Sequence, residues 1–470
     1  MSDTTRRVFL AGATAAGIGG LAGCSDDTGD ESTDDSTEDA EDDFTDDSTD
    51  DTADDSVEPT YEIWGADQGT NTIYIHQPTD DGGFEQVDEI DTGAAEGEVP
   101  HMVDYTSDYE YAAVACTAGA RVLVYRTEDR ELVANLETGA GTHFAGFSPN
   151  DEHIHVDVIG EEKIVRVDAD LENEEFEQVA EIDVRENETI LNAGIESGAP
   201  ICHQYAQDGR SLHTMGPSYH DAALVIVDHD DFSVDRAYSG DEIPTNCGTV
   251  GHPTDEKFYL TAGLPSDPDA DPDEDPVAAE GVGDFYVYDT AEDEIDTVGS
   301  TGGVDAHGFW LTPNGEELWV LNRETNDGLV LDPDTDEVID EIDAFGPEQS
   351  DDPAESDAPD IMWASPDGEY MFVTLRGPNP LSGDPHAATG INPGYAVFDI
   401  ESRERVDVVQ PDGDNPDSDF HGIGVRPVGE YDGFTSPPYG GAGFRHARRN
   451  RIAAGKLGDQ TSNPCFVTSV

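Results

Sequence analysis

The stretch Asp305–Asn322, "DAHGFWLTPNGEELWVLN", has the pattern of a β-hairpin. A short apolar run leads into a Pro-Asn-Gly turn, and a second run with alternating apolar residues follows it. The same unit recurs without gaps from five other starting points: Pro100, Thr142, Pro200, Asn246 and Pro359. Recurrence of one supersecondary unit predicts a repeat architecture.

Most of these units continue into a third and a fourth strand, as in "DGLVLDPDTD" from Asp327. Four antiparallel strands recurring every 40 to 60 residues predict propeller blades, because one blade buries both faces only when neighbours pack on it. A seventh unit is split: the segment from Tyr61 lacks a first strand, and Phe420–Val428 is a first strand without successors. Pairing these two segments closes the ring and covers the strand edges. We therefore predict an all-β, seven-bladed β-propeller closed by its N- and C-terminal strands.

The units "HGFWLTPNGEELWVLN" and "IMWASPDGEYMFVT" resemble the repeats of YVTN-type propellers, a WD40-like class with seven blades. The resemblance runs from about Tyr61 to Val428. It implies the fold more than a function, because such propellers host lactonases, metal carriers, oxidoreductase domains and surface-binding proteins.

The charge of the chain restricts its partners. Its 470 residues include 107 Asp and Glu against 21 Lys and Arg, a formal net charge of −86. Repulsion excludes nucleic acids and anionic membrane surfaces. Acidic residues spread along the chain, with hydrophobic residues still at 36%, resemble the surfaces of proteins from extreme halophiles. In molar salt the Debye length falls to about 3 Å, which screens the self-repulsion.

The N-terminus combines two export motifs in order. "TRRVFL" contains Arg6 and Arg7 and resembles a twin-arginine export signal, and "LAGC" ends at Cys24 and resembles a lipobox. With the acidic composition, these motifs resemble a propeller lipoprotein of a halophilic archaeon. The resemblance implies a lipidated Cys24 that holds the protein on the extracellular face of the cell membrane, with the lipid anchor as its only membrane contact.

Four segments are expected. Residues 1–23 form the signal peptide, and residues 24–59, almost entirely Asp, Glu, Ser, Thr and Gly, form an acidic disordered linker. Residues 60–430 form the propeller. Residues 431–470 are basic and follow the closed ring as a disordered tail.

One position recurs in register around the predicted ring, six residues before the Pro of each turn. In six of the seven units a residue type that can bind a metal occupies it: His101, His143, Cys247, His307, Asp360 and His421. The unit from Pro200 has Ile201 there, and His203, on the same face of that strand, could substitute. Since first strands line the channel of a propeller, we expect these side chains to converge near one mouth.

Imidazole, thiolate and carboxylate together favour Zn²⁺, with copper as second choice, over Ca²⁺ or Mg²⁺. The histidine-rich centre is similar to that of periplasmic zinc-chaperone propellers, which implies a metal carrier. Two alternatives stay open: a structural ring of hydrogen-bonded polar groups, and a disulfide between Cys202 and Cys247. The strand "HIHVD" from His153 to Asp157 is expected to be a solvent-facing edge and not a ligand pair.

The sequence thus predicts an exported, lipid-anchored propeller that binds a transition metal at its channel as a carrier or sensor, and favours a non-enzyme over an enzyme. The alternatives are a non-enzymatic surface recognition scaffold and a lactonase-like hydrolase. No Ser-His-Asp order, phosphate loop or nucleophile elbow is found in the required context. A metal transporter or a surface protein is the expected partner, and a monomer the expected state.

Overall fold

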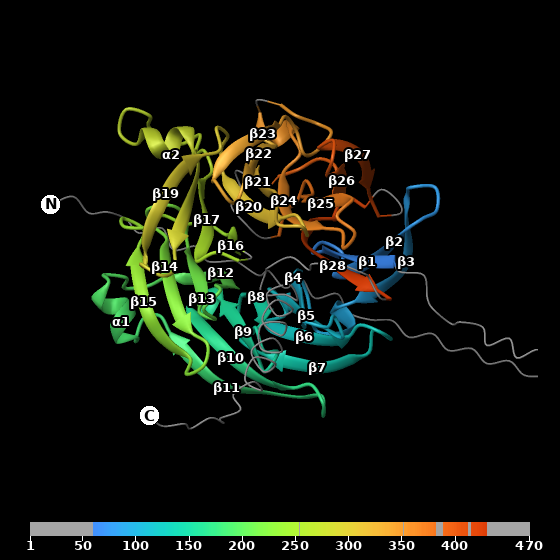
Figure 1. The fold of residues 1–470 in the computed structure, drawn as a ribbon, viewed down its shortest axis with the longest axis horizontal. Coiled ribbons are helices and arrows are strands. Elements are labelled where there is room, and N and C mark those ends of the chain that lie inside the picture. Colours follow the sequence, from blue (N-terminus) through green and yellow to red (C-terminus); the bar gives the residue numbers. More distant parts are fainter. Residues whose placement is uncertain (1–59, 253, 351, 382–388, 412–414, 430–470) are drawn as a thin grey trace, which may run out of the picture. The chain divides into compact units, whose positions relative to one another are not determined.

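The computed structural model describes residues 60–252, 254–350, 352–381, 389–411 and 415–429. These residues form seven four-stranded antiparallel sheets arranged in a ring, a seven-bladed β-propeller (Figure 1). The predicted fold class is therefore confirmed. The export motifs with Arg6, Arg7 and Cys24, the acidic linker and the basic tail lie outside the described residues.

The first three complete blades follow one another along the chain. Blade 1 consists of β4 (Pro100–Tyr105), β5 (Tyr111–Cys116), β6 (Arg121–Arg126) and β7 (Leu132–Glu137). Blade 2 consists of β8 (Thr142–Phe147), β9 (His153–Val158), β10 (Lys163–Asp170) and β11 (Glu175–Asp183). Blade 3 consists of β12 (Ala199–Tyr205), β13 (Ser211–Gly216), β14 (Ala223–Asp228) and β15 (Ser233–Ser239).

The remaining blades complete the ring. Blade 4 consists of β16 (Thr249–Gly251), β17 (Lys257–Leu264), β18 (Val282–Asp289) and β19 (Glu294–Ser300). Blade 5 consists of β20 (Ala306–Leu311), β21 (Leu318–Asn322), β22 (Asp327–Asp332) and β23 (Glu337–Ile342). Blade 6 consists of β24 (Pro359–Ala364), β25 (Tyr370–Leu375), β26 (Gly394–Asp399) and β27 (Glu404–Val409). Blade 7 joins β28 (Phe420–Val428) to β1 (Thr60–Asp67), β2 (Thr72–Pro78) and β3 (Phe84–Asp91).

Local sequence accounts for the hairpins that begin each blade. Gly315 and Gly368, in the two turns that best match the repeat, have φ values of 72° and 74°, a conformation that glycine adopts without strain. Every residue of the inner strand β20 is buried, whereas most of the outer strand β23 is exposed. Solvent exposure thus rises from the channel toward the rim in this blade, as expected for sheets that pack face to face around an axis.

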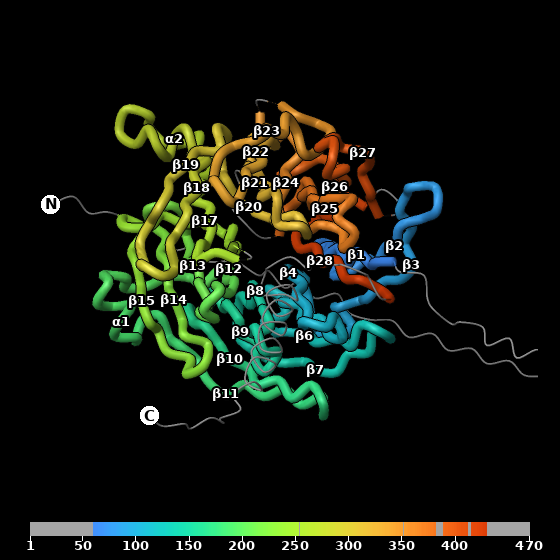
Figure 2. Tube along the Cα trace, viewed as in Figure 1, coloured from blue at the N-terminus to red at the C-terminus, as the bar shows by residue number. Residues whose placement is uncertain are grey.

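The predicted closure of the split blade is confirmed. Strand β28 pairs antiparallel with β1, from Thr60 opposite Val428 to Asp67 opposite Phe420. Figure 2 shows these segments, red and blue, side by side. The carboxylate of Asp67 strengthens the junction, because it accepts hydrogen bonds from the backbone N–H of Asp419 at 2.8 Å and from the Ser418 hydroxyl at 2.6 Å.

Neighbouring blades contact one another through their inner strands all the way around the ring. Most interfaces are apolar, and Trp310 of blade 5 packs on Trp363 of blade 6 with ring centroids 4.1 Å apart. Short helices interrupt the connections: η1 (Gly93–Ala95), η2 (Ile159–Glu161), α1 (Glu188–Asn192), α2 (Pro276–Glu280) and η3 (Pro353–Glu355). Within the described residues, no helix has the length and apolar character needed to span a membrane.

Candidate metal centre

The inner strands bring the predicted ligand positions to the channel. Five of these residues stand second in their strand: His101 in β4, His143 in β8, His307 in β20, Asp360 in β24 and His421 in β28. Cys247 lies just before β16, and all six residues are buried. The shared register of the blades therefore places these side chains near the axis.

Three of the histidines are in contact with one another. The ring of His101 stacks on that of His421 with centroids 3.6 Å apart, and the ring of His143 is tilted against that of His101 with centroids 3.8 Å apart. His421 donates from Nδ1 to the carbonyl of His101 at 3.2 Å, and His143 donates from Nδ1 to the carbonyl of Ile201 at 2.7 Å. Burial lowers the pKa of both rings, so that they are neutral and each Nε2 carries a lone pair. A backbone carbonyl that holds one ring nitrogen is the usual support of a metal-binding histidine.

A second part of the centre joins His307, Asp360 and His421. One ligand atom of each lies within 4.8 Å of the others, and all three residues are buried. His307 Nε2 lies 2.8 Å from Asp360 Oδ1, and His421 Nε2 lies 3.4 Å from Asp360 Oδ2. The contact between His307 and Asp360 lacks the alignment of a hydrogen bond. A lone pair of His421 thus faces a carboxylate, an arrangement that a cation between them would stabilise.

Two thiols border this group. Cys202 Sγ lies 3.8 Å from His143 Nδ1, and Cys247 interacts with Cys202 and with the charge of His307. The hydrogen bond with Cys202 and the charge of His307 outweigh burial and hold the pKa of Cys247 well below its usual range. Both cysteines are free, so the alternative of a disulfide between them is not observed. In blade 3, Cys202 reaches the group although Ile201 occupies the aligned position.

Two arginines set the charge around Asp360. Arg376, fully buried, lies 2.7 Å from Asp360 Oδ2, and Arg323 lies 3.7 Å from Oδ1. Burial opposes ionisation, but His421, His307 and Arg376 keep the pKa of Asp360 well below its usual range. Although burial and Arg323 oppose it, the negative charges of Asp360 and Cys247 raise the pKa of His307 to about 9. Without a bound ion, His307 therefore carries a second ring proton at neutral pH, which a metal ion would have to displace.

The aligned position six residues before the Pro of each turn does not identify these two arginines. Arg323 follows His307 by sixteen residues, and Arg376 follows Asp360 by the same number. Each comes directly after the second strand of its blade. A comparison of blades extended by one residue beyond that strand would have found them.

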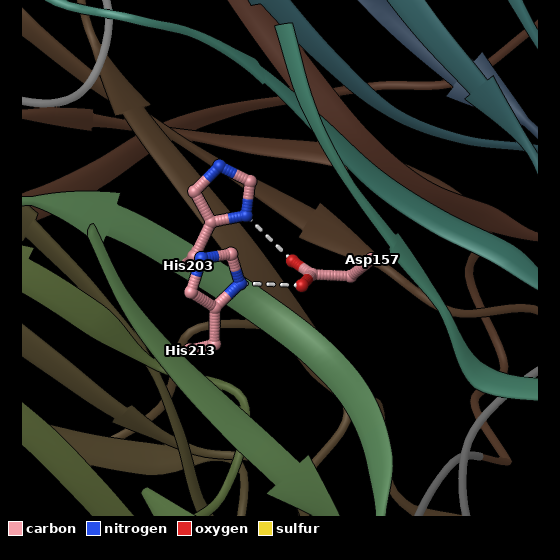
Figure 3. A group of neighbouring side chains, drawn as sticks. All are labelled: Asp157, His203 and His213. Atoms are coloured by element: carbon pink, nitrogen blue, oxygen red, sulfur yellow. Dashed lines mark hydrogen bonds and ion pairs between the residues drawn. The ribbon is translucent and has the colours of Figure 1, made fainter. Parts of the chain in front are cut away.

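His203 does not lie with the channel residues. The structure places it between blades 2 and 3, beside Asp157 of β9 and His213 of β13 (Figure 3). His155, expected on a solvent-facing edge, is fully buried, and that expectation is wrong. Strand β9 is covered on both faces by neighbouring blades, so its alternating pattern does not mark a solvated face.

The chemistry of these groups fits a metal ion. The channel offers neutral imidazole nitrogens, a carboxylate oxygen and a thiol of low pKa, which are ligands that zinc and copper accept. Neither ring nitrogen of His307, nor Asp360 Oδ1, has an aligned hydrogen bond among the described residues. Because Arg376 occupies Oδ2 of Asp360, Oδ1 is the oxygen that a metal would use.

Comparisons with known proteins support the fold alone. No family model and no curated protein matches the chain. A solved structure of a protein from Lactobacillus plantarum is similar, with a TM-score of 0.54 and 11% identity over 78% of this chain and all of that one (100%). Hydrazine synthase from Kuenenia stuttgartiensis has a TM-score of 0.44 and 12% identity, covering 64% of this chain and 77% of that chain. A dihydro-heme d1 dehydrogenase has a TM-score of 0.46 and 11% identity, covering 77% and 74%.

Proposed function

We propose that this propeller binds one transition-metal ion at its channel, with zinc preferred over copper, as a non-catalytic metal carrier or sensor. The observation that carries the proposal is the group of His307, Asp360 and His421, whose ligand atoms lie within 4.8 Å of one another in a buried site. Cys247, whose thiol interacts with His307, would supply the fourth ligand of a tetrahedral set. His101 and His143 then line the route by which an ion reaches or leaves the group.

Metal content after loading tests this proposal. Protein kept in molar KCl is loaded with Zn²⁺, dialysed and analysed for metal per chain. The variant His307→Ala should lose one equivalent. His229→Ala, which changes a buried histidine outside the candidate metal groups, should keep it. Full metal content in His307→Ala would remove the channel site from consideration.

Cobalt tests the role of Cys247. In the Co²⁺-loaded protein, coordination by sulfur produces a thiolate-to-cobalt charge-transfer absorption. The variant Cys247→Ser should lose that band, whereas Cys116→Ser, which changes a buried free cysteine in blade 1, should keep it. Absence of the band in the wild-type protein would leave Cys247 outside the ligand set.

The same proposal places the protein outside the cell. The motifs at Arg6, Arg7 and Cys24 support twin-arginine export followed by lipid anchoring on the extracellular face, in a halophilic setting that the charge of −86 favours. Replacing both arginines by Lys should trap precursor in the cytoplasm, and Cys24→Ser should release exported protein from the membrane. A monomer would then deliver its metal to a transporter or a surface protein.

A surface recognition scaffold is the second candidate. The ion pairs from Arg376 and Arg323 to Asp360 favour it, because they give the centre a structural role without any metal. Protein that binds no Zn²⁺ or Cu²⁺ after loading would make this candidate the better one. A lactonase-like hydrolase would instead require turnover of a lactone, which His307→Ala should abolish.

A further inference from the structure

A second cluster of metal-ligand side chains lies away from the channel, in the interface between blades 2 and 3. His203 of β12 and His213 of β13 are directly opposite each other in the sheet register, and their rings stack with centroids 4.4 Å apart. Both rings face Asp157, which β9 of blade 2 presents to them (Figure 3). All three side chains are fully buried.

The hydrogen bonds of this cluster show which ring nitrogens carry the protons. His203 Nδ1 lies 2.6 Å from one oxygen of Asp157, and His213 Nδ1 lies 2.6 Å from the other. An ionised carboxylate only accepts, so both rings carry their proton on Nδ1. Among the described residues, no arginine or lysine forms an ion pair with Asp157. The buried carboxylate is therefore held by two imidazole N–H groups, and no arginine or lysine of the described residues compensates its charge.

The surrounding layer has hydrogen-bonding groups that the protein does not satisfy. Nε2 of His203 and Nε2 of His155 are buried and have no hydrogen-bond partner among the described residues. Ser211 Oγ lies 2.9 Å from His213 Nε2 and 3.2 Å from His155 Nδ1. If Nδ1 of His213 bound a metal, its ring proton would lie on Nε2. The Ser211 hydroxyl could then accept a hydrogen bond from that N–H.

Blade 2 leaves room for this arrangement. A Cβ atom at residue 146 would lie 2.9 Å from His203 Nε2, so Gly146 in the inner strand of blade 2 makes space for that ring. The ring of Phe144 packs edge-on against His203 with centroids 4.9 Å apart. The histidine is therefore held in place from the neighbouring blade.

The geometry points to a second metal site, in which Nδ1 of His203, Nδ1 of His213 and a carboxylate oxygen of Asp157 bind a divalent transition ion. One ligand atom of each residue already lies within 4.8 Å of the others. Two ligands of tetrahedral zinc, each at about 2.0 Å from the ion, are about 3.3 Å apart, so the 2.6 Å contacts must open by less than 1 Å. Two imidazoles and one carboxylate form a known zinc ligand set that leaves one coordination position open.

Metal stoichiometry tests the second site separately from the channel. Full-length protein in molar KCl is titrated with Zn²⁺, and bound metal per chain is measured after equilibrium dialysis. Wild-type protein should bind two equivalents, Asp157→Asn and His213→Gln should each lose one, and His307→Ala should lose the other. Asp151→Asn, which changes another buried carboxylate of blade 2, one that accepts a hydrogen bond from the Ser107 N–H at 3.0 Å, should keep both.

The possible outcomes separate the two proposals. If Asp157→Asn and His213→Gln keep all the metal of the wild-type protein, the cluster is a structural hydrogen-bond network and the second site is refuted. If these two variants lose an equivalent while His307→Ala loses none, the second site stands and the channel site fails. Should either variant not fold, an anomalous difference map of zinc-loaded wild-type crystals decides, because the proposal requires a peak between the two imidazoles and Asp157.

Discussion

Asp360 in the channel and Asp157 between blades 2 and 3 are both fully buried, and each faces two histidines. The channel carboxylate also contacts Arg376 and Arg323, whereas among the described residues Asp157 has no guanidinium or ammonium partner. Any metal ion that binds Asp360 must therefore do so beside an arginine that already forms an ion pair with the same carboxylate. Asp157 has imidazole partners only, so we expect its charge to depend on a bound ion more than that of Asp360 does.

Removing the fixed cation should have the largest effect on stability. Arg376 binds both oxygens of Asp419 at 2.8 Å and Asp360 Oδ2 at 2.7 Å. The variant Arg376→Ala leaves both carboxylates buried without this partner and should lower the free energy of unfolding by about 3–5 kcal/mol. Urea unfolding in molar salt measures the loss. A value below about 1 kcal/mol, as for an exposed pair, would show that Asp360 does not depend on this arginine.

The metal-free protein should lose stability on both sides of neutral pH. Burial lowers the pKa of His213 to about 4, so between pH 6.5 and 4 the unfolded chain binds more protons and stability falls as pH falls. Other buried histidines of lowered pKa, such as His143 and His421, add to this acid limb. Against the opposing effects of burial and Arg323, Asp360 and Cys247 raise the pKa of His307 to about 9, so its contribution to stability is full below pH 6.5 and falls as pH rises through 9. His213 and His307 should each contribute about 3 kcal/mol.

Variants identify the two limbs. In the presence of a chelator, His213→Gln should reduce the acid limb by its own share and leave the alkaline limb, whereas His307→Gln should reduce the alkaline limb and leave the acid limb. Urea unfolding at several pH values measures both. If the two variants change the same limb, the histidines do not titrate as separate sites.

Changing Asp157, which is paired with imidazoles, should lower the free energy of unfolding less than removing the arginine partner of Asp360. Asp157→Asn turns one acceptor oxygen into a donor that faces a ring N–H, and should cost about 1–3 kcal/mol in metal-free protein. Blade 5 has Phe309 opposite Val320 where blade 3 has His203 opposite His213. Replacing the histidines by Phe and Val together with Asp157→Leu should recover most of the loss, because the carboxylate and the two imidazoles that it faces are then removed together. A larger loss in the triple variant would mean that the polar layer itself holds the two blades together.

A rim ion pair should have the smallest effect. Arg403 of blade 6 lies 2.7 Å from Glu317 and 2.7 Å from Asp340 of blade 5, near the solvent. Arg403→Ala should change the free energy of unfolding by less than about 1 kcal/mol, and less still in molar salt, which screens exposed charges. If Arg403→Ala lowered the free energy of unfolding as much as Arg376→Ala does, and equally at low and high salt, exposed ion pairs would matter as much as buried ones, contrary to this prediction.

Several properties of this protein follow from the sequence by itself. The number of blades, the split seventh blade and the register of the inner strands could be predicted, because turn residues such as Gly315 and the alternation of apolar residues act locally. The same register correctly placed His101, His143, His307 and His421 near the axis, since equivalent strand positions of a repeat occupy equivalent places in the ring.

Only the tertiary structure decided which side chains meet. In blade 3, Cys202 lies at the channel and His203 faces blade 2. The inner strands β4, β8, β12, β20 and β24 all contain a one-residue register shift near their start, so strict alternation from Ile201 did not predict the side that His203 faces. His155 and Asp157 are buried because a neighbouring blade covers the face that alternation suggested was solvated. Whether a buried carboxylate meets Arg376 or two imidazoles likewise depends on contacts between residues far apart in the chain, which local patterns do not encode.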